Sequence, residues 1–232
     1  RTVVMLDKMD PVGRWYLERH AMFTASQNYR LIEAGPGGKG LSKTALTYIE
    51  EKAIESMTEL WEAPKIEFVE SLLHGRVYEE PAFRHYVKKT GNKIMEYHGT
   101  ENPIYLPYNK FSGGSPDGVA RHEGKIFWGL ELKCPAVPKN HFKNLQLKDQ
   151  WDLKQAKIQD YTQCQMLIMA SGANGWHWMS YDERFKDPAL KGKIIEVKPD
   201  KNFMINLDLK IKLAEKERKR IVELYTNFGK TA

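Results

Sequence analysis

Ser115-Pro116-Asp117-Gly118 is followed, fourteen positions after its aspartate, by Glu131-Leu132-Lys133-Cys134-Pro135. The second segment ends a nearly continuous apolar run, and such runs are typical of a strand that is covered on both faces. Successive side chains of a strand point to opposite faces, so Glu131 and Lys133 share one face. Buried Glu and Lys side chains are rarely tolerated without partners. The stretch therefore predicts a site where a metal ion is the partner of Glu131 and a lysine lies beside it.

The residue types suit a hard divalent cation. Magnesium prefers oxygen ligands and keeps several waters, so Asp117, Glu131 and a main-chain carbonyl would suffice to hold it. Metal-dependent phosphodiester hydrolysis also needs a cation near the attacking water or the phosphate, and the compact charge of Lys133 suits that task. The alternative interpretation is a Pro-Asp-Gly turn with a surface ion pair, which is common turn chemistry. The combination with an apolar strand ending in Glu-x-Lys favours the metal site.

Composition sets the broad class. The chain has 232 residues and a net charge of +6, which predicts one globular domain over residues 1–232 and allows a polyanionic partner. It has no run of about 18 apolar residues and no signal-peptide pattern, so we expect a soluble, cytoplasmic protein without a membrane partner. Its two cysteines, Cys134 and Cys164, exclude a four-cysteine metal cluster and fit a reducing compartment.

Periodicity predicts both helices and strands. Helical patterns cover residues 10–26, 41–57, 65–90, 152–170 and 208–228. Strand patterns cover residues 94–98, 103–106, 126–134, 176–181 and 193–197. Pro81 interrupts the third helical segment, which is therefore either two helices or one bent helix. The glycine-rich segment 34–40 lacks the spacing of a phosphate-binding loop and is interpreted as a surface connector.

These motifs resemble the core of the PD-(D/E)xK nucleases, in the form found in phage lambda exonuclease and related viral recombination exonucleases. The resemblance continues in three further segments, which occur in the family's order: Trp15-x3-Arg19 with Thr24-Ala25-Ser26, Gly75-x2-Tyr78-Glu79, and Gln163-Cys164-Gln165. Such ordered co-occurrence is much more specific than any single motif. The resemblance implies an α/β fold with a central mixed β-sheet flanked by helices.

The resemblance also assigns catalytic roles to individual residues. Asp117 and Glu131 would bind Mg²⁺, which Mn²⁺ can replace, together with the main-chain carbonyl of Leu132. Lys133 would be the catalytic lysine. Glu79 would bind a water ligand of the metal, and Gln163 would order the nucleophile beside the lysine.

A second set of residues would recognise the DNA end. Arg19, Ser26 and Ser115 match the family's pocket for a terminal 5′-phosphate, and guanidinium and hydroxyl donors both suit phosphate oxygens. Leu72 aligns with a residue that wedges the end of the duplex. These assignments rest on the resemblance alone.

The resemblance implies a Mg²⁺-dependent 5′-to-3′ exonuclease that acts on double-stranded DNA ends. It would degrade the 5′-phosphorylated strand and leave a 3′ single-stranded overhang for recombination by strand annealing. Family members form a homotrimeric ring, work with a phage-type single-strand annealing protein, and act in the host bacterial cytoplasm. Two alternatives remain: another PD-(D/E)xK endonuclease or repair nuclease, and a catalytically inactive DNA-end-binding module. The presence of Asp117, Glu131 and Lys133 argues against an inactive module.

Overall fold

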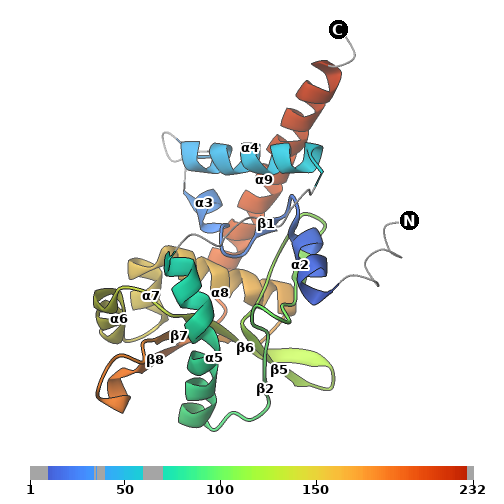
Figure 1. The fold of residues 1–232 in the computed structure, drawn as a ribbon. Coiled ribbons are helices and arrows are strands. Elements are labelled where there is room, and N and C mark those ends of the chain that lie inside the picture. The colour runs from blue at the N-terminus through green and yellow to red at the C-terminus, as the bar shows by residue number, and fades with distance from the viewer. Residues whose placement is uncertain (1–9, 34, 36–39, 60–69, 229–232) are drawn as a thin grey trace.

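The computed structural model describes residues 10–33, 35, 40–59 and 70–228. A five-stranded mixed sheet in the order β2-β5-β6-β7-β8 lies at its centre, with β6 and β7 parallel and the other neighbours antiparallel (Figure 1). A smaller sheet has the order β1-β4-β3. The strands are β1 Phe23–Thr24, β2 Met95–Tyr97, β3 Leu106–Asn109, β4 Ser112–Gly114, β5 Gly118–His122, β6 Lys125–Lys133, β7 Trp176–Tyr181 and β8 Gly192–Val197.

Helices cover the central sheet on both faces. They are α2 Pro11–Arg19, α3 Tyr29–Ile32, α4 Lys43–Met57, α5 Glu70–Thr90, α6 Pro138–Leu145, α7 Gln150–Ala156, α8 Ile158–Ser171 and α9 Lys201–Phe228, with a short 3₁₀ helix, η2 Pro188–Leu190. The predicted α/β fold with a central mixed sheet flanked by helices is confirmed. No helix in the described ranges combines the length and apolar character that a bilayer crossing requires.

The alternation of β6 explains the two layers of the core. Leu130 and Leu132 pack with Ala82 and Tyr86 of α5 in one apolar cluster. On the other face, Trp178 of β7, which pairs with Glu131, packs in the cluster that contains the buried side of α8. Since consecutive side chains of a strand alternate between faces, Glu131 points toward the α8 layer.

Local sequence sets where several elements begin and end. Asp10 caps α2 by accepting a hydrogen bond from Gly13 N at 2.8 Å, and Pro11 follows in the first turn, where proline is tolerated. Strands β5 and β6 are joined by Glu123 and Gly124, which both have positive φ, as a tight two-residue hairpin turn requires.

Four predicted element boundaries were wrong. The helix predicted over 10–26 ends at Arg19, because Ala21 adopts a left-handed conformation (φ 57°) and Phe23–Thr24 then form β1. The helix predicted over 152–170 is divided into α7 and α8 at Lys157, whose backbone is not helical (φ −144°). The helix predicted over 208–228 begins at Lys201. The strand predicted over 103–106 begins at Leu106 and belongs to the smaller sheet.

Pro81 leaves α5 as a single helix from Glu70 to Thr90, and residues 65–69 of the predicted segment lie outside the described part of the chain. Proline at this position removes the hydrogen bond to the carbonyl of Val77. Val77 is 65% exposed, so water can satisfy that carbonyl. The cost of a proline inside a helix is therefore reduced at this site.

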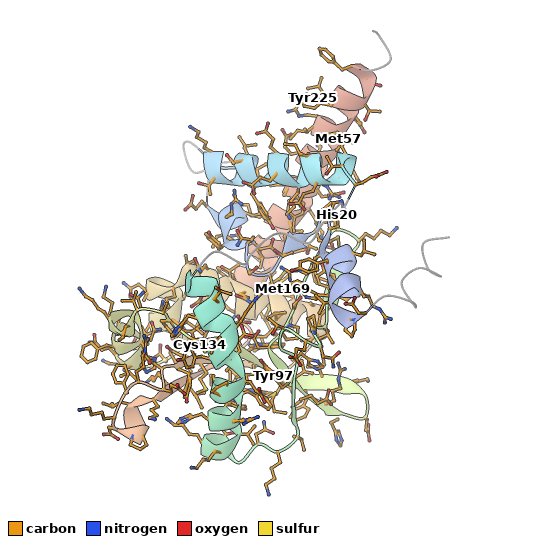
Figure 2. The ribbon with its side chains drawn as sticks, in the orientation of Figure 1. His20, Met57, Tyr97, Cys134, Met169 and Tyr225 are labelled. Atoms are coloured by element: carbon orange, nitrogen blue, oxygen red, sulfur yellow. The ribbon has the colours of Figure 1, made fainter. Side chains whose placement is uncertain are left out.

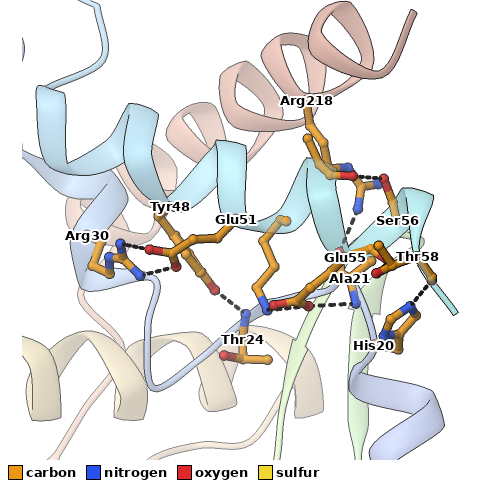
Figure 3. A network of polar contacts seen from close by, with 12 residues as sticks. His20, Ala21, Thr24, Arg30, Tyr48, Glu51, Glu55, Ser56, Thr58 and Arg218 are labelled. Carbon is orange, nitrogen blue, oxygen red and sulfur yellow. Dashed lines mark hydrogen bonds and ion pairs between the residues drawn. The ribbon is translucent and has the colours of Figure 1, made fainter. Parts of the chain in front are cut away.

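The turn after α2 is held by side chains from two distant helices (Figure 3). Glu55 of α4 accepts a hydrogen bond from Ala21 N at 3.1 Å, and Arg218 of α9 donates one to Ala21 O at 2.6 Å. Both backbone polar groups of this left-handed residue are thus paired. The turn fixes the direction in which the chain leaves α2 and enters β1.

Candidate active site

The pairing of β5 with β6 places Asp117 beside the C-terminal end of β6. Gly118 pairs with Leu130, so the residue before β5 lies beside the end of β6. Asp117 Oδ2 accepts a hydrogen bond from Leu132 N at 2.6 Å. The two segments that carry the sequence motif therefore form one site, as predicted from their pattern.

Lys133 lies at the centre of this site. Its Nζ donates to Glu131 Oε1 at 2.7 Å and to Gln163 Oε1 of α8 at 3.1 Å. Gln163 therefore lies beside the lysine, where the resemblance placed it. The same Nζ is 3.9 Å from Asp160 Oδ1, a further carboxylate on α8.

Burial and like charge shift the pKa values of the carboxyl groups upward. Burial, then repulsion from Glu79, raises the pKa of Asp117 to about 7. Burial, then repulsion from Asp117, raises the pKa of Glu131 to about 8, against the opposing effect of Lys133. The pKa of Glu79 is also raised, by burial and by Glu131. Burial lowers the pKa of Lys133, but Glu131 and Asp160 outweigh that effect, and the net shift is upward.

The carboxylates fit a divalent cation. Glu131 is 2% exposed, and its Oε2 is buried without a hydrogen-bond partner. A buried, unpaired carboxylate oxygen is costly, and a cation would compensate it. Asp117 and Glu131, with the carbonyl of Leu132 on the same strand, give the oxygen donors that magnesium prefers. In the described part of the chain no three His, Cys, Asp or Glu side chains form a ready metal site.

Arg19 and Ser115 are brought together from distant parts of the sequence. Arg19 Nη1 donates to Ser115 Oγ at 3.0 Å, and Trp15 Nε1 donates to the same oxygen at 2.6 Å. The Arg19 guanidinium lies 4.3 Å from the centre of the Trp15 ring. Burial lowers the pKa of Arg19, and in the described residues no carboxylate forms an ion pair with it. A half-buried arginine whose hydrogen bond goes to a hydroxyl, and which has no ion-pair partner within the described ranges, is suited to an anion.

One cavity lies between Ser115, which accepts a hydrogen bond from Arg19, and the carboxylates of Glu79 and Asp117; Arg76 lines it, whereas Arg19 and Glu131 do not. The cavity has a volume of about 380 Å³, and its lining includes Trp15, Glu79, Ser115 and Asp117. Tyr97 and Cys134 pack beside α5 at the edge of this region (Figure 2). The hydroxyl of Ser115 and the carboxylate of Asp117 therefore face a single space large enough for a nucleotide-sized group.

Among the predicted site residues that the structure describes, only Glu79, Ser115 and Asp117 line this cavity. Ser26 lies half-buried in the turn after β1, and its side chain makes no hydrogen bond in the described part of the chain. Ala25 N donates to Gly113 O at 2.8 Å, so Ser26 directly follows a residue that borders the segment leading to Ser115. Leu72 belongs to the first turn of α5, but its side chain lies outside the described residues, and its predicted role stays a prediction.

Sequence reasoning missed Asp160 and gave no role to Trp15. Asp160 lies three residues before Gln163, a spacing that places both side chains on one face of α8. That spacing was the available signal, but a carboxylate in the first turn of a helix is usually solvent-exposed. Here Asp160 is only 4% exposed.

Comparison with known proteins defines the family. Residues 14–174 match the model of the YqaJ-like viral recombinase domain. This chain belongs to the YqaJ-like viral recombinase family. No curated protein matches the sequence.

The fold of this family member is also that of solved exonucleases. It superposes on the alkaline exonuclease LHK-Exo from Laribacter hongkongensis with a TM-score of 0.75 and 19% identity, covering 95% of this chain and 100% of that one. The structure of LHK-Exo in complex with dAMP matches equally well. A phage related exonuclease from Haemophilus somnus 129PT matches with a TM-score of 0.64 and 14% identity, covering 91% and 99% of the two chains.

Proposed function

We propose that the protein is a Mg²⁺-dependent 5′-to-3′ exonuclease that degrades the 5′-phosphorylated strand of double-stranded DNA and leaves a 3′ overhang for strand annealing. The observation that carries this proposal is the shared cavity, in which Ser115 lies two residues from Asp117. A terminal phosphate at Ser115 and Arg19 would place the first phosphodiester near the carboxylates. The exonuclease names of LHK-Exo and the Haemophilus somnus protein support the same proposal.

Different residues of the site would perform different parts of the hydrolysis. Asp117, Glu131 and the Leu132 carbonyl would hold Mg²⁺, for which Mn²⁺ can substitute, and the ion supplies Lewis acidity and a more acidic water. Lys133, held by Gln163, orients the attacking water and offsets charge that develops on the phosphate. Glu79, at the cavity wall, accepts hydrogen bonds from water in the cavity.

Arg19 and Ser115 would determine which kind of DNA end is digested. Their donors favour a 5′-phosphate over a 5′-hydroxyl, because the hydroxyl would leave the half-buried guanidinium without a counter-charge. Ser26 is the proposed third contact. The homotrimeric ring, the phage-type single-strand annealing partner, the bacterial cytoplasmic location and the wedge role of Leu72 belong to this proposal through the family resemblance.

Product analysis tests the proposal directly. A linear duplex with one 5′-phosphorylated end and one 5′-hydroxyl end is incubated with the protein and MgCl₂. We expect mononucleotides from the phosphorylated strand only, and loss of their release in Lys133→Ala. Cleavage of covalently closed circles would instead favour an endonuclease. Equal nucleotide release from the parent and Lys133→Ala would contradict the catalytic assignment.

Arg19→Ala provides the matching test of end selection. It should slow digestion of phosphorylated ends much more than digestion of hydroxyl ends, while Mg²⁺ binding stays at the parent level. Equal rates on the two kinds of end in the parent protein would contradict the phosphate pocket.

A further inference from the structure

Asp160 is a buried carboxylate next to Lys133 that the proposed chemistry leaves without a role. It is 4% exposed, and its two oxygens have different neighbours. Trp178 Nε1 donates to Oδ2 at 3.2 Å, and Lys133 Nζ lies 3.9 Å from Oδ1. Trp178 is fully buried, so its indole N–H is a rigid hydrogen-bond donor that fixes the orientation of the Asp160 carboxylate.

Three acceptors therefore surround one ammonium group. Glu131 and Gln163 accept hydrogen bonds from Lys133 at 2.7 and 3.1 Å, and Asp160 is the third neighbour. Glu131 is also a proposed metal ligand. A metal ion bound to its carboxylate would weaken the interaction between Glu131 and the Lys133 ammonium group. Gln163 is neutral, so it cannot replace the lost charge interaction. Asp160 is the carboxylate that remains available to the lysine alone.

We infer that Asp160 is a positioning residue, which holds the Lys133 ammonium in place while Glu131 is engaged by the metal. This inference rests on the proposed nuclease function. Asp160 acts through Lys133 and has no contact with substrate. The indole N–H of Trp178 orients the carboxylate, and Gln163, one helical turn further along α8, completes the arrangement.

Steady-state kinetics on a 5′-phosphorylated duplex test this role. Asp160→Asn keeps the shape and loses the charge, and we expect kcat to fall by roughly 10- to 100-fold, because small misplacements of catalytic groups have effects of that size. KM for DNA should stay near the parent value. Trp178→Phe keeps the carboxylate but removes its orienting donor, and should lower kcat by a smaller factor. Asp152→Asn changes a carboxylate of α7 that accepts an exposed hydrogen bond from Lys148 N at 2.9 Å, and should leave kcat unchanged.

A double-mutant comparison separates positioning from general damage. In a Lys133→Ala background, Asp160→Asn should have no further effect on residual activity, because Asp160 is proposed to affect the reaction only through the Lys133 ammonium group. An equal loss in both backgrounds, or parent kcat in a folded Asp160→Asn variant, would overturn the inference. If Asp160→Asn does not fold, parent kcat in Trp178→Phe would overturn it. Parent activity in Lys133→Ala would contradict the proposed function itself, which is a different outcome.

Discussion

At the scale of single residues, Asp117 and Glu131 link metal binding to pH. Both pKa values are raised, so between about pH 4 and about pH 8 the folded metal-free protein holds more protons than the unfolded chain. Its stability therefore decreases as pH rises through this window. Cation binding needs the charged carboxylates and must release protons. We expect the Mg²⁺ affinity to increase from about pH 6 to about pH 8. Titration calorimetry in buffers of different ionisation enthalpy measures the Mg²⁺ affinity and the number of protons released. A pH-independent affinity without proton release would contradict the prediction.

Glu131→Gln should separate the stability of the site from its function. A pKa of about 8 leaves Glu131 largely protonated near neutral pH, so the neutral amide preserves its charge state and we expect the metal-free protein to keep the parent's free energy of unfolding to within about 1 kcal/mol. We expect Mg²⁺ to raise the Tm of the parent protein, and Glu131→Gln should abolish this increase. Thermal unfolding with and without MgCl₂ measures both effects. Glu50→Gln, on the exposed side of α4, is the control and should change neither quantity; a Glu131→Gln protein less stable than this range would refute the prediction.

The sequence predicted most of the carboxylate and lysine site but not its supporting residue. Asp117, Glu131 and Lys133 were predictable because a strand's alternation and a short motif determine which side chains meet. Asp160 was not, because its burial depends on Trp178, which belongs to a strand eighteen residues later in the chain. Contacts of this kind arise from packing of α8 on the sheet and have no local sequence pattern.

At the scale of elements, Gly129 makes the close approach of β6 and β7 possible. A Cβ atom at Gly129 would lie 2.2 Å from the ring of Trp176, which is fully buried and cannot move aside. We expect Gly129→Ala to destabilise the protein by about 1–3 kcal/mol. Urea denaturation measures the change, and parent stability would contradict this account of the strand pair.

Gly75 is the matched control on α5. A Cβ atom there would have no heavy atom within 4 Å, and the residue has ordinary helical backbone. Gly75→Ala should therefore stabilise the helix by about 0.5–1 kcal/mol. Opposite signs for the two substitutions would show that packing at Gly129, and not loss of glycine as such, determines the effect.

Element types were more predictable than element boundaries. The apolar runs that become β6, β7 and β8 were recognised because their patterns extend over six to nine residues. The small sheet was missed: β1 and β4 have two and three residues, and their pairing depends on chain segments far apart. The end of α2 was missed because Ala21 is held in its left-handed conformation by α4 and α9, which no local signal indicates.

At the scale of the whole molecule, Arg218 joins α9 to the turn that follows Arg19. It lies 197 residues from Ala21 in sequence, donates to Ala21 O, and forms a 2.8 Å ion pair with the buried Glu215. Arg218→Ala would leave both groups without this partner, and we expect a loss of about 1–3 kcal/mol.

The same variant should also change substrate preference. Arg19 lies two residues before Ala21, so loosening the turn should displace its guanidinium relative to Ser115. Digestion of 5′-phosphorylated ends should slow more than digestion of 5′-hydroxyl ends, while Mg²⁺ binding at Asp117 and Glu131 is retained. Arg220→Ala is the control, because Arg220 pairs with Glu217 on the exposed side of α9 and should affect neither stability nor end preference. If Arg218→Ala lost stability but kept the parent's ratio of rates on the two ends, the turn would support the fold without positioning Arg19.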